Sequence, residues 1–351
     1  MPVATADQYA EMLERAGAGR FAFPAVNVTS SQTLNGVLRG FADAGSDGIV
    51  QATVGGAKYL GGGDALAGAR ALAAMARELA EPLGVLVAVH TDHAPPDSVD
   101  GFLRPLIADS AGRRANGHGP LFNSHMFDGS TLPLEENLRR SSELLDTAGA
   151  AGVVLEVEVG VVGGEEDGVR GPDGDRERLY TTTADLLRTA DVLGTGERGR
   201  YLLAATFGNV HGVYAPGRVE LRPGILSDGQ AALAAARRGA RFAYVFHGSS
   251  GSSPADVHAA IAAGVVKVNL DTDAQYAFTR AVAGHVLANY DGVLKLDGGI
   301  GRKADYDPRS WGAKAETALA AHVAGAARLF GSAGRSLLRV RRADPSPDAR
   351  P

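Results

Sequence analysis

Three histidines lie at or near the ends of separate apolar segments: His93 ends VLVAVHTDH, His211 lies in AATFGNVHG and His247 in AYVFHGSSG. Each segment is rich in valine, alanine or phenylalanine and gives way to turn residues, which is typical of a buried strand that runs into a functional loop. Three imidazoles brought together by a fold suit Zn²⁺ with an open fourth position for water or substrate. The sequence therefore predicts a catalytic zinc site.

Carboxylates accompany these histidines. Within HTDH, the alternation of a strand places His90 and Asp92 on one face, with His93 one residue further along at the loop. A carboxylate beside a metal ligand can orient that ligand or transfer a proton itself. Other expected strands end in polar residues as well: Asn27, Gln51, Thr53, Asp128, Glu156, Glu158, Asn269, Asp271 and Asp273. If these ends meet at one edge, they form a single polar site.

Two further segments fit a phosphate site. GSSGSS (Gly248–Ser253) and NLDTD (Asn269–Asp273) follow the last two expected strands. Small residues at such positions let backbone N–H groups approach an anion.

The elements that must position these residues alternate along the chain. Helical patterns such as Ser31–Ala44, Asp64–Glu81, Leu134–Ala148 and Ala231–Arg238 separate eight strand-like segments. The segments are Ala22–Val28, Gly48–Thr53, Val85–His90, Leu121–Met126, Val153–Val159, Leu202–Phe207, Phe242–His247 and Val265–Leu270. Eight such repeats predict a (β/α)8 TIM barrel, an α/β fold with its active site at the carboxyl ends of the strands. An open doubly wound sheet is the alternative, but it would carry a glycine fingerprint after the first strand, and Asn27 is followed by none.

Domain boundaries and the longest loop complete this outline. We expect residues 1–340 to form one barrel domain and residues 341–351 a disordered tail, because the tail has no apolar periodicity. The glycine- and acid-rich stretch Gly160–Tyr180 is long enough to be a functional loop.

Composition excludes several classes of protein. With 351 residues, a net charge of −5 and no basic stripe, the chain is not expected to bind nucleic acid. It has no cysteine, so a metal must be held by imidazole and carboxylate groups. No apolar run is long enough to span a membrane and no apolar signal core is seen near the start, so a cytoplasmic protein is expected.

Several long motifs stand in order along nearly the whole chain: FAFPAVNVTSSQTLN, VHTDHAP, PLFNSHMFDGS, LEVEVGVVGGEEDGV, TFGNVHGVY, VFHGSSGS, VVKVNLDTDAQYAFTR and YDPRSW. Together they resemble class II (zinc-dependent) fructose-1,6-bisphosphate aldolases. The resemblance implies reversible cleavage of fructose 1,6-bisphosphate to dihydroxyacetone phosphate and glyceraldehyde 3-phosphate, by a cytoplasmic glycolytic homodimer or homotetramer. It also implies one catalytic Zn²⁺, a possible second metal position and possibly a monovalent cation.

The resemblance also implies a role for individual residues. His93, His211 and His247 would bind zinc, with Asp128 and Glu158 as alternative or second-site ligands. Asp92 would be the acid that protonates the aldehyde oxygen, and Glu166 the base that removes a proton from dihydroxyacetone phosphate. The substrate-binding set would be Asn27 and Thr53 on the aldehyde side, Gly212, Gly248, Ser250, Asn269, Asp271 and Thr272 around the triose phosphate, and Arg309 on the far phosphate, reaching across a subunit interface.

Departures from the family pattern leave substrate alternatives open. Ser249 stands where the family has glycine, Ala52 replaces a common aromatic residue and Thr53 a serine. The same chemistry on tagatose 1,6-bisphosphate or another aldehyde is therefore an alternative. A non-catalytic sugar-phosphate-binding paralogue and a metal-dependent barrel hydrolase are more remote ones; the hydrolase would normally place His-x-His on the first strand, which offers only Asn27.

Overall fold

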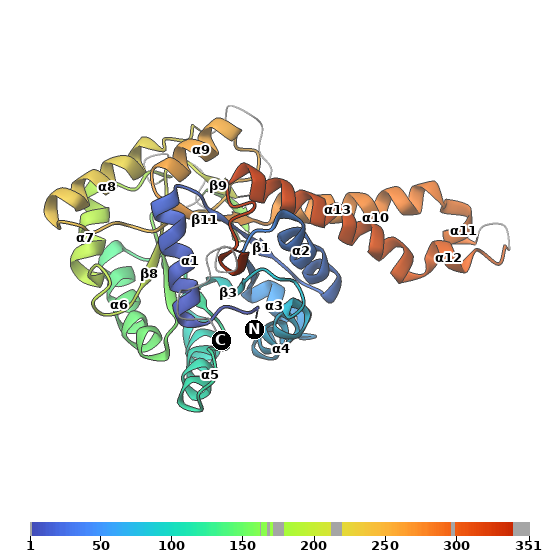
Figure 1. Cartoon of the computed structure of the whole chain (residues 1–351), viewed down its shortest axis with the longest axis horizontal. Coiled ribbons are helices and arrows are strands. Elements are labelled where there is room, and N and C mark those ends of the chain that lie inside the picture. Colours follow the sequence, from blue (N-terminus) through green and yellow to red (C-terminus); the bar gives the residue numbers. More distant parts are fainter. Residues whose placement is uncertain are drawn as a thin grey trace, which may run out of the picture.

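Eight parallel strands close into a barrel in the computed structural model (Figure 1). The structure describes residues 2–161, 163–166, 169–170, 179–211, 220–295 and 299–339, with the side chains of 163–166, 169–170 and 211 excepted. The barrel strands are β1 (Phe23–Asn27), β2 (Gly48–Thr53), β3 (Val87–Ala94), β4 (Ser124–Phe127), β5 (Val154–Val159), β8 (Tyr201–Ala205), β10 (Tyr244–Phe246) and β11 (Val265–Leu270). Their order around the barrel follows the chain, and β11 closes it by pairing with β1. The predicted (β/α)8 TIM barrel is confirmed.

Helices cover the barrel between the strands. They are α1 (Ala6–Gly19), α2 (Ser31–Ala44), α3 (Val54–Leu60), α4 (Ala65–Ala80), α5 (Arg104–Ala115), α6 (Leu134–Ala151), α7 (Thr183–Leu193), α8 (Gly224–Ala236), α9 (Pro254–Ala262), α10 (Thr272–Ala288), α11 (Tyr290–Leu294), α12 (Lys303–Tyr306) and α13 (Pro308–Leu329). A short π-helix, Val99–Leu103, leads into α5. Among the described residues, no helix is both long and apolar enough to cross a bilayer.

The helix α1 closes the amino end of the barrel. Thr5 begins it with a capping box, in which the threonine and Gln8 satisfy each other's backbone N–H groups. Its apolar face, which includes Tyr9, Met12 and Leu13, joins inward-facing residues of the strands in one buried cluster. The amino end is therefore filled with side chains, and the polar strand ends are left at the opposite, carboxyl end.

The helices α10 and α13 lie side by side as an arm that projects from the barrel, with α11 and α12 at its outer end (Figure 1). At its inner part α13 packs closely on α2, where Gly36 and Gly40 face it. A Cβ atom at Gly40 would lie 2.7 Å from Cβ of Val323, so only glycine permits this approach. The predicted tail, residues 341–351, lies outside the described residues.

Two strand predictions need correction at the site. The HTDH sequence lies inside β3, which runs on to Ala94, and the register with β4 shifts between Thr91 and Ala94. At this irregularity His93 takes a left-handed φ of +42°. His211 does not follow a barrel strand directly: β8 ends at Ala205, and His211 belongs to the two-residue strand β9 (Val210–His211). That strand pairs with β6 (Gly163–Glu166), which in turn pairs with β7 (Val169–Arg170).

Candidate active site

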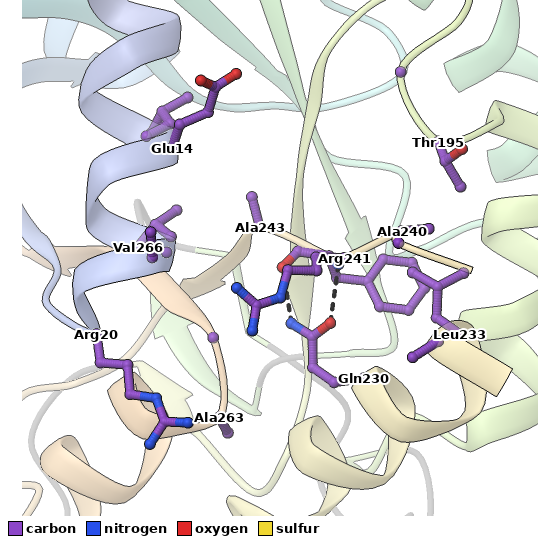
Figure 2. Close-up of a pocket in the computed structure, with 18 of the residues that line it drawn as sticks. Glu14, Arg20, Thr195, Gln230, Leu233, Ala240, Arg241, Ala243, Ala263 and Val266 are labelled. Atoms are coloured by element: carbon purple, nitrogen blue, oxygen red, sulfur yellow. Dashed lines mark hydrogen bonds between the residues drawn. The ribbon is translucent and has the colours of Figure 1, made fainter. Parts of the chain in front are cut away.

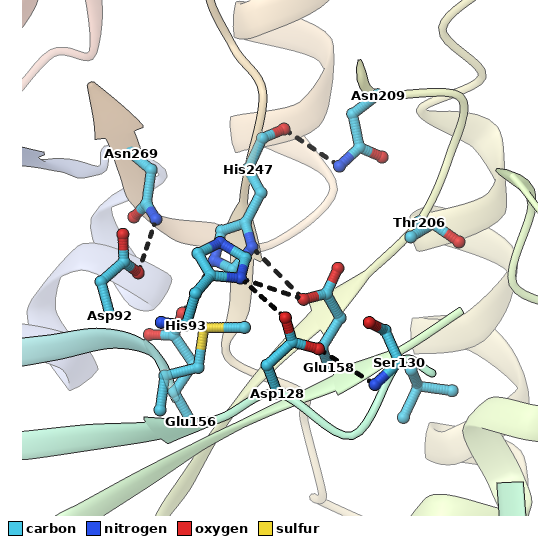
Figure 3. A network of polar contacts seen from close by, with 12 residues as sticks. Asp92, His93, Asp128, Ser130, Glu156, Glu158, Thr206, Asn209, His247 and Asn269 are labelled. Carbon is cyan, nitrogen blue, oxygen red and sulfur yellow. Dashed lines mark hydrogen bonds and ion pairs between the residues drawn. The ribbon is translucent and has the colours of Figure 1, made fainter. Parts of the chain in front are cut away.

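The carboxyl ends of the barrel strands bring the predicted polar residues together (Figure 3). Strand β3 contributes Asp92 and His93, β5 contributes Glu158, and His247 follows β10. Asp92 and His247 are fully buried and Glu158 is 1% exposed. The ring centroids of His93 and His247 are 4.6 Å apart, although the two residues are far apart in the sequence.

His93 faces two carboxylates. Its Nδ1 lies 3.1 Å from Oδ2 of Asp128 and 3.6 Å from Oε2 of Glu158. Burial alone would raise the pKa of Asp128, but hydrogen bonds from His93 and Ser130 and the charge of His93 together bring it below its ordinary value. Asp128 is therefore ionised at neutral pH. The positive φ of His93 is a strained backbone conformation for a residue other than glycine. Such conformations persist only where the surrounding structure holds them, and they are common at active sites.

His247 forms a hydrogen bond with Glu156. Its Nε2 donates to Oε1 of Glu156 at 2.8 Å, while Nδ1 lies 3.9 Å from Oε2 of Glu158. Burial lowers the pKa of His247 well below its ordinary value, and the charges of His93 and Lys267 act in the same direction. Pairing with a carboxylate fixes the proton on Nε2 of the neutral ring. Nδ1 is then the ring nitrogen whose lone pair can bind a metal.

The donor set fits a divalent cation. Three groups of side chains place one ligand atom each within 4.8 Å of one another: Asp92, His93 and His247; His93, Asp128 and Glu158; His90, Asp92 and Glu156. Their donors are imidazole nitrogens and carboxylate oxygens, the ligands that zinc and related divalent metals accept in the absence of thiolates. The first two groups share His93, so they describe two neighbouring positions around one residue.

Asp92 is held in place by two amides. Its Oδ2 accepts from Nε2 of Gln51 at 2.9 Å, and its Oδ1 accepts from Nδ2 of Asn269 at 3.1 Å. These two hydrogen bonds hold the carboxylate next to His93 and His247, with which it forms one potential metal-binding group. Asp92 is thus an oriented, buried carboxylate next to the metal position, as a residue that transfers a proton to substrate must be.

Comparison with known proteins identifies the family. A family model described as class-II fructose-bisphosphate aldolase matches residues 7–335. The chain is 57% identical to a fructose-bisphosphate aldolase of Streptomyces galbus over 96% of its own length and 100% of the relative's. It is 54% identical to that of Mycobacterium leprae, over 96% and 99% of the two chains.

The chain belongs to the class-II fructose-bisphosphate aldolase family. Its structure agrees: the crystal structure of a fructose-bisphosphate aldolase from Campylobacter jejuni superposes with a TM-score of 0.83 at 34% identity, over 95% of this chain and 97% of that one. The resemblance of the sequence motifs to this family is confirmed. The barrel-hydrolase alternative is thereby set aside.

The backbone of the segment that carries His211 lies close to the loop that carries His247. His211 pairs with Gly164 in the small sheet, and its side chain lies outside the described residues. Just before it, Asn209 donates to the carbonyl of His247 at 3.0 Å. A Cβ atom at Gly248, whose φ is +61°, would lie 2.5 Å from the carbonyl oxygen of Val210. The segment that carries His211 therefore packs directly against the loop that carries His247.

Five of the residues predicted to bind the triose phosphate lie at the carboxyl ends of β10 and β11. Gly248 and Ser250 follow β10, and Asn269, Asp271 and Thr272 lie where β11 leads into α10. Ser249, the residue that departs from the family pattern, donates through Oγ to the carbonyl of Asn269 at 2.7 Å. This hydrogen bond ties the two loops together.

Other predicted residues lie at different places. Asn27 ends β1, and its buried Oδ1 accepts no hydrogen bond from a described residue. Thr53 ends β2 and caps α3 through Gly56. Arg309 lies in the first turn of α13, where its guanidinium pairs with Asp307. Glu166 ends β6, and its side chain lies outside the described residues. Gly212 lies outside them entirely.

Sequence reasoning singled out Glu156 and His90 but missed the residues that pair with them beneath the site: Lys267, Ser124 and Tyr9. Lys267 of β11 is fully buried and lies 2.8 Å from Oε2 of Glu156. Nδ1 of His90 forms a hydrogen bond of 2.8 Å with Oγ of Ser124. The same Oγ forms a hydrogen bond of 3.1 Å with the hydroxyl of Tyr9 on α1. A lysine within the apolar run VVKVNL was the one signal available, because charged residues are rare in strands buried on both faces.

A large groove lies at the opposite, amino end of the barrel (Figure 2). It encloses about 860 Å³ between α1 and the segments before β8, β10 and β11, and Arg20, Gln230, Arg241 and Val266 are among its lining residues. None of the predicted site residues lines it. This groove and the predicted site residues are thus at opposite ends of the barrel.

Proposed function

We propose that this chain cleaves fructose 1,6-bisphosphate reversibly to dihydroxyacetone phosphate and glyceraldehyde 3-phosphate, with Zn²⁺ as its metal. The observation that carries the proposal is the position of Asp92, held by two amides in the same buried group as His93 and His247. Membership of the aldolase family supports the same reaction. The proposal includes a cytoplasmic, glycolytic homodimer or homotetramer and a monovalent cation near the phosphate.

The residues divide the reaction between them. His93, His211 and His247 would hold the divalent ion, and its positive charge would stabilise the negative charge that develops on the ketose carbonyl oxygen. Asp92 accepts the proton of the C4 hydroxyl as the C3–C4 bond breaks and the aldehyde forms, and it returns that proton in condensation. Glu166 supplies the proton that the triose carbanion takes up at C3, and it removes that proton in the reverse direction. Asp128 and Glu158 serve as alternative metal ligands beside His93.

Substrate recognition is assigned to the loops around the barrel mouth. Gly212, Gly248, Ser250, Asn269, Asp271 and Thr272 would hold the triose phosphate, Asn27 and Thr53 would line the aldehyde pocket, and Arg309 of a neighbouring subunit would bind the far phosphate. The small residues of the loop after β10 support this, because backbone N–H groups can approach an anion there.

A coupled cleavage assay tests the reaction and its substrate together. Fructose 1,6-bisphosphate and tagatose 1,6-bisphosphate are compared by kcat/KM, each with and without a chelator. We expect chelator-sensitive cleavage with preference for the fructose compound. Preference for tagatose bisphosphate would move the proposal to the alternative substrate, whereas zinc binding without cleavage of either sugar would indicate a non-catalytic paralogue.

A further inference from the structure

Lys267 is a buried cation directly beneath the metal-binding residues. It lies on β11 with no exposed surface, and its Nζ donates to Oε1 of Glu156 at 3.1 Å and lies 2.8 Å from Oε2. Glu156 is equally buried, and its Oε1 also accepts from His247. A buried ion pair of this kind contributes little stability that apolar residues of similar size could not provide. Its position next to the site points to another role.

The same glutamate belongs to a second group of potential metal ligands. His90 Nε2 lies 3.6 Å from Oε2 of Glu156 and 3.8 Å from Oδ1 of Asp92, and all three side chains are buried. The three residues form an inner group that is able in composition and spacing to bind the same cation as His93 and His247.

The inner group adjoins the outer group of Asp92, His93 and His247, because Asp92 belongs to both. An ion drawn into the inner group would lie below the barrel mouth, among residues with no exposed surface, and would be out of reach of a sugar phosphate. Productive binding therefore requires that the inner group be the weaker one.

We propose that Lys267 acts as a tethered cation that keeps metal out of the inner group. A divalent ion bound to Oε2 of Glu156 at the usual ~2.1 Å would lie within about 5 Å of the ammonium group, where repulsion in a buried site is strong. Lys267 also neutralises Glu156 without a metal. Glu156 then accepts the Nε2–H of His247, which directs the other ring nitrogen away from the ammonium. The inference rests on the proposed metal-dependent aldolase site.

The test is the number and position of bound ions in the full-length protein. Lys267→Met removes the charge and keeps most of the side-chain length. After loading with Zn²⁺ and dialysis, we expect one ion per chain in the wild type and a second in the variant, with at least tenfold higher affinity than for any second ion in the wild type. Metal analysis gives the number, and anomalous X-ray scattering gives the position. The double variant Lys267→Met/His90→Phe lacks an inner ligand and should return to one ion.

Two further measurements keep the test decisive. If the methionine variant does not fold, Lys267→Gln retains an amide donor for Glu156 without the charge and should show the same second ion. Zinc-loaded wild-type crystals report directly on the inner group whichever variant folds. An ion between His90 and Glu156 in the wild type, or a single outer ion in both variants, would overturn the role of Lys267. A wild type that binds no metal at all would instead contradict the proposed aldolase site.

Discussion

Replacing Asp92 by asparagine separates the chemistry of this residue from its structural role. The amide has the size of the carboxylate, but it cannot accept and return a proton. Gln51 and Asn269 both donate to Asp92, and the Oε1 of Gln51 and Oδ1 of Asn269 accept no hydrogen bond from a described residue. If one of these two amides turns over, it presents its carbonyl oxygen to the new NH2 group, so both hydrogen bonds persist.

The expected magnitudes for stability and rate therefore differ widely. With both hydrogen bonds retained, the free energy of unfolding should change by about 1 kcal/mol or less. Loss of general acid–base catalysis typically lowers the rate about 10²–10⁴-fold, which corresponds to roughly 2.7–5.4 kcal/mol of transition-state stabilisation. Asp92→Ala would instead leave two buried NH2 groups without an acceptor, at about 1–3 kcal/mol each.

The assay compares kcat/KM for fructose 1,6-bisphosphate cleavage, zinc content and urea unfolding in the wild type and in Asp92→Asn. Asp47→Asn is the matched control. Asp47 is also buried and also accepts two hydrogen bonds, from the backbone N–H groups of Leu86 and Leu337, but it lies at the amino end of the barrel. We expect the control to keep wild-type kcat/KM. The assignment of Asp92 is falsified if its asparagine variant, with normal zinc content, retains kcat/KM within threefold of the wild type.

Three more predictions follow from other parts of the molecule. Exhaustive chelation should abolish cleavage and added Zn²⁺ should restore it; full activity of metal-free protein, verified by metal analysis, would contradict metal dependence. Gly40→Ala should destabilise the protein by about 1–3 kcal/mol, because its Cβ would overlap Val323. The control Gly325→Ala on α13, whose Cβ meets no atom within 4 Å, should unfold no earlier than the wild type, and equal melting temperatures for both variants would refute the packing argument. Burial raises the pKa of Asp47 above its ordinary 3.8, so the folded state holds this proton more tightly than the unfolded chain and stability falls as pH rises through that raised pKa. Urea unfolding across this range should show a shallower decline for Asp47→Asn, and parallel curves would exclude the effect.

The sequence was sufficient for the architecture because its signals are local. Each of the eight barrel strands is an apolar run bounded by turn residues, and the observed strands differ from the expected ones mainly at their ends. The helix expected over Ser31–Ala44 has those limits in the structure, where Ser30 caps its first turn. Strand limits near the site were less predictable, since the register shift at His93 depends on how β3 pairs with β4.

The sequence by itself determined which residues stand at the carboxyl ends of the strands, and hence that Asp92, His93 and His247 face one site. What only the tertiary structure decided is how the buried groups pair. Glu156 meets His247 across 91 residues of chain and Lys267 across 111. Such contacts depend on strand stagger and barrel closure, which no local pattern encodes. The tautomer of His247 and the cation beneath it are therefore properties of the closed barrel.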